Sequence, residues 1–171
     1  MMHSSQRPSG LRFLENLAYL VPGYQGYREY ELRRREDSRL RARVCRRIDH
    51  LVANLDEIAA RWGDSAPEDS AHALREGRRR LAGKGEAVRL APGELGTFFE
   101  SERIPEITLE RLLESDLLIF EDLEAAQAHL EQSRSLSTAP RSMRRFVREL
   151  ELILGRLEEH LIMRERVMAG G

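Results

Sequence analysis

Acidic and histidine side chains are the residues of this chain whose types could support metal chemistry. A helical protein of this size can hold two metal ions when two helices each supply a Glu and two others each supply a Glu-x-x-His pair, all pointing inward. The sequence contains no Glu-x-x-His. Asp69 and His72 come nearest to it, at the edge of an expected loop, whereas His50, His129 and His160 have no acid three residues before them. We therefore predict no metal site.

The other chemistry that the residue types could support is nucleophilic or phosphate-binding. Cys45 is the only cysteine, and nothing near it in the sequence offers a resolving partner, so we expect a half-buried structural thiol. The Gly83-Lys84-Gly85 step is not a phosphate loop, because that motif follows a strand and has a Gly separated by four residues from a Gly-Lys-Ser/Thr step. We predict no catalytic residue, no cofactor and no enzymatic activity.

The composition is typical of a protein built from long helices. Charged residues make up 33% of the 171 residues and aromatic residues 6%, with Leu, Ala, Arg and Glu prominent. The net charge is -1, and Lys84 is the only lysine. A single cysteine indicates a reducing compartment, and we find neither a secretory signal nor an apolar run of about 20 residues that could cross a bilayer. We expect a cytoplasmic protein.

Three apolar seams with alternating spacings of four and three predict three long helices, at about 27–62, 105–132 and 142–168. We expect an all-α fold, an elongated antiparallel three-helix coiled-coil-like bundle with two short accessory helices. Those would span Leu11 to Val21 and the stretch from Ser65 or Pro67 to Leu81, where Gly83 to Gly85 would end the helix. Residues 1–9 are predicted to be a disordered tail and 10–171 a single helical domain. The seam residues are Leu40, Val44, Ile48, Leu51, Leu55, Ile58 and Trp62; Leu109, Leu113, Leu117, Phe120, Leu123, Ala126 and Leu130; and Met143, Val147, Leu150, Leu154, Leu157 and Leu161.

Two aromatic stretches are candidates for partner binding. The turn Pro22 to Tyr27 carries Tyr24 and Tyr27, and the loop expected from Val88 to Ile104 carries Phe98 and Phe99. Such side chains either pack against neighbouring helices or form a recognition surface, and the sequence leaves both open. A loop of this length in a compact domain is often functional.

The turn and the residues after it also resemble a family signature. The run from Leu20 to Tyr27, followed by Glu29, Glu31, Arg33-Arg34 and the Asp37-x-x-Leu40-Arg41 step, is similar to a Pro-Gly-Tyr-x-Gly-Tyr motif of bacterial and archaeal helical proteins. A second patch, Val88 to Ala91 through Gly96 to Phe99, resembles a loop that those proteins carry before an acidic helix. This chain has Gly93-Glu94-Leu95 where they carry an aromatic, Gly-rich turn. The resemblance implies an all-helical domain and no assigned chemistry.

Charge is distributed unevenly along the chain. The segment from Tyr27 to Arg47 contains nine Arg and four acidic residues. The segment from Glu94 to Glu131 contains eleven acidic residues and two Arg. The acidic helix is therefore a natural neighbour for the Arg-rich one. Clustered Arg could instead neutralise phosphates. The polyanion-binding candidates are Arg33, Arg34, Arg39, Arg43, Arg46, Arg47, Arg78, Arg79 and Arg80.

Two functions follow from these features. The first is a non-catalytic helical interaction or scaffold module that acts through apolar seams and charged helix faces, with a protein partner or self-association. The alternative is a binder of nucleic acid or an anionic membrane surface through the Arg-rich helix. No small-molecule substrate is inferred.

Overall fold

The protein is described by a computed structural model that covers residues 9–90, 95–101 and 103–170, and this part of the chain is all helical. The predicted disordered tail lies outside the described residues, except Ser9. The α-helices are α1 (Ser9–Leu20), α2 (Arg33–Trp62), α3 (Glu68–Leu90), α4 (Glu106–Gln132) and α5 (Pro140–Met168). Short 3-10 turns lie at Tyr30–Leu32, Gly63–Ser65 and Leu95–Glu100.

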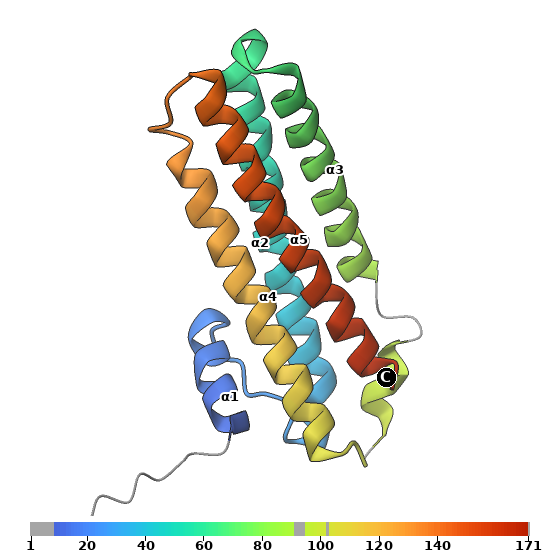
Figure 1. Ribbon diagram of the computed structural model, residues 1–171. Helices are drawn as coiled ribbons and strands as arrows, with labels where there is room; N and C mark the ends of the chain where they lie inside the picture. Colours follow the sequence, from blue (N-terminus) through green and yellow to red (C-terminus); the bar gives the residue numbers. More distant parts are fainter. Residues whose placement is uncertain (1–8, 91–94, 102, 171) are drawn as a thin grey trace, which may run out of the picture.

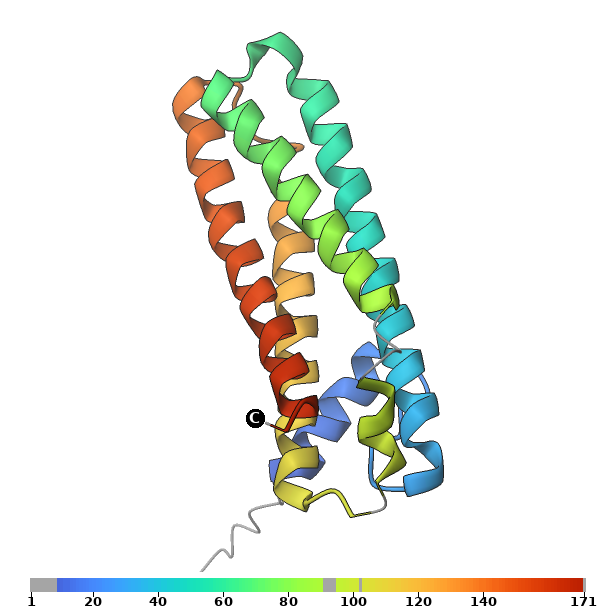
Figure 2. The same cartoon turned by 90° about the vertical axis from the view of Figure 1, so that its right-hand side faces the viewer.

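Four long helices form the body of the molecule, and α1 lies against α4 on its outside (Figure 1). In ring order the neighbours are α2, α3, α5 and α4, so α2 lies diagonally opposite α5. Side-chain pairs show the directions. Arg47 meets Glu124 and Arg61 meets Ser133, so α2 and α4 run parallel. Both are antiparallel to α3 and α5 (Figure 2).

The three long helices expected from the seams are all present, but the three-helix arrangement differs from the structure in two ways. The chain has a fourth long helix, α3, in place of a short accessory one, and α2 and α4 are parallel neighbours. The second difference follows from the place of α4, which lies diagonally opposite α3 and beside α2 (Figure 2). Seams of similar length fit either arrangement, so the sequence pattern alone did not distinguish them.

The glycines of α3 explain why it is longer than predicted. A Cβ added at Gly85 would lie 2.9 Å from Cγ2 of Ile48 on α2, and one at Gly77 would lie 3.3 Å from Cδ1 of Leu154 on α5. These positions allow α3 to approach both neighbours closely, so Gly85 is an interhelical contact rather than a helix stop. The expected loop beginning at Val88 is helical up to Leu90.

One apolar cluster joins all the helices. Val44, Leu117 and Leu154, one from each predicted seam, are buried in it together with residues of α1 and α3. The turn after α1 contributes as well, through Tyr24 and Tyr27. Because helices gain most of their stability from burying an apolar face, this shared core accounts for the assembly of the bundle within one chain. Among the described residues, none of the helices has both the length and the apolar character needed to cross a membrane.

Candidate interaction surface

A buried polar cluster ties α2, α4 and α5 to the turn that follows α1. The Arg164 side chain on α5 donates to Asp116 on α4 at 2.5 Å, to Asp37 on α2 at 2.6 Å and to the Tyr27 hydroxyl at 3.2 Å. The Tyr27 hydroxyl in turn donates to Asp116 at 2.7 Å. Asp37 also accepts from Arg41 at 2.8 Å. Two carboxylates and two guanidinium groups therefore balance in charge.

The turn brings Tyr27 to this cluster through two residues with positive φ. Gly23 has φ 77° and Gly26 has φ 76°, values that favour glycine. The buried Glu36 carboxylate accepts the Gln25 backbone N–H at 2.9 Å, and Arg39 donates to the Gly23 carbonyl. The start of α2 therefore holds the turn in place.

Burial and the neighbouring charges both shift the pKa values of the cluster. Burial raises the pKa of Tyr27 and of Asp116, and for Asp116 the Arg164 guanidinium and the Tyr27 hydroxyl oppose that rise. Burial alone would lower the pKa of Arg164, but Asp116, Tyr27 and Asp37 raise it well above its usual value. Arg164 therefore stays charged, and the cluster is a closed structural unit. The sequence signal for it was an Arg at a core position of α5, three residues after the seam residue Leu161.

The four aromatic partner-binding candidates lie in or against the core. Tyr24, Tyr27 and Phe99 are buried, and Phe98 is half-buried. Tyr27 stacks on Phe99 with ring centroids 5.2 Å apart, and Phe98 meets Phe99 edge-on at 4.9 Å. The two stretches that the sequence marked separately thus meet each other. Their rings fill the lower end of the bundle rather than face solvent.

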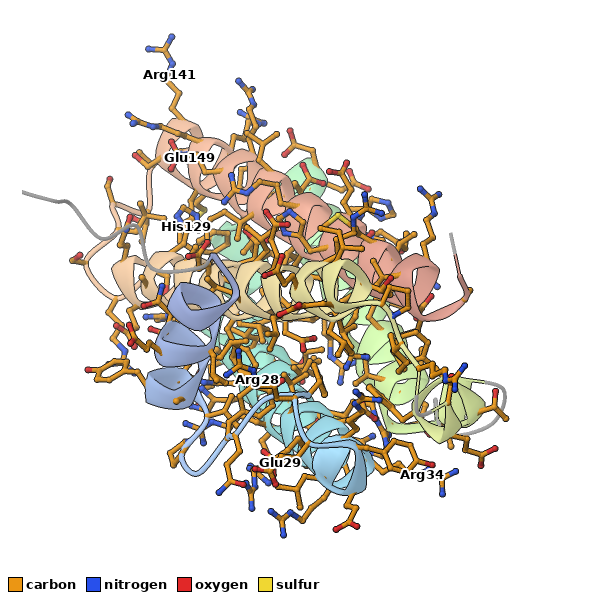
Figure 3. All side chains as sticks on the ribbon, turned by 90° about the horizontal axis from the view of Figure 1, so that it is seen from below. Arg28, Glu29, Arg34, His129, Arg141 and Glu149 are labelled. Carbon is orange, nitrogen blue, oxygen red and sulfur yellow. The ribbon has the colours of Figure 1, made fainter. Side chains whose placement is uncertain are left out.

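Most of the polyanion candidates have acidic partners in the structure. Arg33 is buried and donates to the Tyr27 carbonyl at 2.8 Å, while Arg34 lies at the edge of the molecule beside Glu100 (Figure 3). Arg43 is half-buried, and Arg46 is exposed with no ion pair in the described part of the chain. The remaining pairs are Arg39 with Glu36, Arg47 with Glu124, Arg78 with Asp56, Arg79 with Glu76 and Arg80 with Glu158.

A hollow with both charged and apolar walls lies between α2 and α3. Its volume is about 320 Å³, and its walls include Arg41, Arg46, Arg89 and Asp49. Cys45 lies in the same wall with its Sγ 3.6 Å from the Gly85 carbonyl. Burial raises the pKa of that thiol, so it is mostly protonated near neutral pH.

Three of the four histidines that the structure describes, His50, His129 and His160, make contacts between helices, and His72 is exposed on α3. His160 pairs with Asp122 at 2.6 Å, and His50 meets Gln127 at 3.1 Å. His129 stacks on Phe146 and lies 4.0 Å from Glu149 between α4 and α5 (Figure 3). No group of three or more potential metal ligands occurs among the described residues.

The outward side of α5 carries a second stripe that the sequence analysis did not identify. Arg148, Leu152, Gly155 and Glu159 follow one another at spacings of four, three and four, opposite the buried seam. We call these four residues the α5 outer face. Leu152 is 66% exposed, and a Cβ added at Gly155 would meet nothing within 4 Å. No ion pair joins Arg148 or Glu159 to any described residue. The spacing of these four residues could have identified the stripe from the sequence. The buried seam through Leu150 and Leu154 is more apolar and was the one recognised.

No other long helix lies over this face. In Figure 2, α5 forms one edge of the molecule, and its own neighbours α3 and α4 lie on its inner side. Figure 3 shows Arg141, one to two turns before Arg148, extending away from the body into solvent. The α5 outer face is therefore open along its length.

Comparisons of the chain with protein-family models, with curated proteins and with solved structures returned no match.

Proposed function

We propose that this protein is a non-catalytic helical interaction module that associates through the α5 outer face. The observation that carries the proposal is Leu152, a large apolar side chain left 66% exposed in the middle of a 29-residue helix. Fully burying a leucine is worth about 1.5–3 kcal/mol, so its exposure leaves a gain available to a partner.

Gly155 supports the same face. Glycine inside a helix costs about 0.5–1 kcal/mol relative to alanine, and the bundle itself does not need it, because an added Cβ would have open space. A residue without a side chain next to Leu152 lets another helix approach closely. The mid-helix glycine is thus explained by a contact outside the chain.

Arg148 and Glu159 supply the selectivity of the face. They flank Leu152 and Gly155 with opposite charges that nothing in the described part of the chain neutralises. Charges at the edge of an interface affect partner choice and orientation more than affinity. The sequence of the face, Arg-Leu-Gly-Glu at helical spacing, therefore favours a helix of complementary charge order. This stripe, rather than the three buried seams, is the surface offered to a partner.

Site-specific photo-cross-linking in cells tests the proposal. A photoreactive amino acid at position 152 should give a cross-linked adduct. The matched control is position 53, because Ala53 is exposed on α2, the helix diagonally opposite α5. An adduct from 152 and none from 53 supports the α5 outer face as the interaction surface, whereas no adduct from 152 contradicts it.

The hollow between α2 and α3 favours one second candidate, the binding of a polyanion. Arg46 is exposed there without an ion pair in the described part of the chain, beside Arg41 and Arg89. Against this, Arg41 and Arg89 already contact carboxylates. Binding to a single-stranded oligonucleotide that weakens with salt and is lost in Arg46→Glu would support it. Binding unaffected by Arg46→Glu would remove the hollow from consideration.

A further inference from the structure

We propose that the occupant of the α5 outer face is a second copy of this chain, with the two α5 helices packed antiparallel about a twofold axis. This inference rests on the proposed function and adds the identity of the partner. An isologous contact of this kind requires a surface that is complementary to itself. The α5 outer face meets that requirement in one register.

In that register the axis passes between Ile153 and Leu154. Leu152 of each copy then lies opposite Gly155 of the other, so the exposed leucine fills the space that the glycine leaves. Because the helices are antiparallel, each such pairing occurs twice. The apolar centre of the interface is made by these two contacts.

Charge complementarity selects the same register. Arg148 lies opposite Glu159 of the second copy. Arg148 and Glu159 are exposed and form no ion pair with any described residue. Because the pairing occurs twice, Arg148 and Glu159 of each copy both face an opposite charge.

The position of the axis also gives the largest overlap. It lies close to the midpoint of α5 (Pro140–Met168), so the two helices overlap along nearly their whole length, which is about 43 Å for 29 residues. One helix pair buries less than the ~800 Å² per partner of a standard interface. We therefore expect a weak dimer with a Kd of about 1–100 μM.

A charge-swap experiment tests both the partner and the register. Sedimentation equilibrium of the full chain should show a monomer–dimer equilibrium for wild type. Arg148→Glu and Glu159→Arg each place two pairs of like charges across the axis and should raise the Kd about tenfold or more. The double variant Arg148→Glu/Glu159→Arg restores both pairs and should return the Kd to within about threefold of wild type.

A matched variant controls for net charge. Arg75 is exposed on α3 and forms no ion pair within the described part of the chain, so Arg75→Glu should leave the Kd unchanged. Circular dichroism on every variant confirms that the helices are intact. A wild-type chain that stays monomeric up to about 1 mM, well above the expected Kd, would overturn the inference. A double variant that remains as weak as the single ones would overturn the register and the inference with it.

The cross-linking at position 152 separates this inference from the proposed function. An adduct of twice the chain mass supports the second copy. An adduct of another mass contradicts the second copy and leaves the interaction function standing. The absence of any adduct contradicts both.

Discussion

Arg164 occupies a position on α5 at which the neighbouring turns supply Leu157, Leu161 and Met168 to the core. It is buried, and its guanidinium group joins Asp116, Asp37 and Tyr27. An arginine here forms hydrogen bonds to three other parts of the chain at once. An apolar residue at this position would form no such directional bonds. We infer that the cluster fixes where α2, α4 and the turn meet α5, the role for which buried ionic groups are best attested.

Removing the arginine should therefore cost much more than removing a surface arginine. Arg164→Met leaves Asp116 and Asp37 buried without their shared partner, and we expect a loss of about 3–5 kcal/mol in the free energy of unfolding. Arg166→Met, on the exposed side of the same helix, should change it by less than about 0.5 kcal/mol. Urea denaturation measures both. Equal effects from the two variants would contradict a structural role for the cluster.

The buried phenols should make the fold sensitive to alkali. Burial, the largest cause, raises the pKa of Tyr24 and of Tyr27, so both stay protonated in the folded chain while they ionise in the unfolded chain near pH 10. Stability is full below that pH. It should fall above it by about 1.4 kcal/mol per pH unit for each group.

The comparison for this second prediction is the variant Tyr24→Phe/Tyr27→Phe. It lacks both hydroxyls, so its free energy of unfolding, followed by urea denaturation from pH 9 to 11, should fall less steeply than that of wild type. Parallel curves for the two proteins would show that these phenols ionise as easily in the folded chain.

At the scale of elements, the apolar periodicity was sufficient to predict the helices α2, α4 and α5. The predicted bounds of α4 and α5 agree with the structure to within two residues. The start of α2 differs, because Tyr30–Leu32 forms a 3-10 turn before the helix proper. The prediction for α3 was wrong at its C-terminal end, since Gly83 and Gly85 were interpreted as a stop. A glycine that ends a helix and one that admits a neighbouring helix look alike until the neighbour is known.

The two glycines of α3 should respond in opposite ways to alanine. At Gly85 the new Cβ would lie 2.9 Å from Ile48, so α2 and α3 must move apart, and we expect a cost of about 1–3 kcal/mol. At Gly83 the Cβ has open space, so the higher helix propensity of alanine should stabilise the protein by about 0.5–1 kcal/mol. Urea denaturation of both variants provides the measurement. A Gly85→Ala variant as stable as Gly83→Ala would show that the helices do not need this close contact.

At the scale of the whole molecule, the order of the helices was not predictable from the sequence. Four amphipathic helices can close in several rings, and the choice depends on how the connection between α3 and α4 crosses the lower end of the bundle. The aromatic residues proposed as candidate sites turned out to mark a contact within the fold. Tyr27 and Phe99 stack where that connection meets the turn after α1, which is a packing relation between distant parts of the chain.

The candidate surface was hidden for a related reason. Nothing in the sequence separates Leu152 and Gly155 from the core residues around them. Which side of α5 faces solvent depends on where α3 and α4 pack. Once the bundle is known, the α5 outer face is the place where a large apolar side chain, an unneeded glycine and two unneutralised charges coincide. The self-association of the protein through this face is the central claim.

Sedimentation velocity of two aspartate variants tests this claim most directly. Leu152 and Leu90 are exposed to nearly the same extent, 66% and 68%, so Leu152→Asp and Leu90→Asp introduce the same charge at equally accessible sites on different helices. We expect Leu152→Asp to sediment as a monomer at concentrations where wild type and Leu90→Asp associate. Association of Leu152→Asp equal to that of Leu90→Asp would contradict the claim.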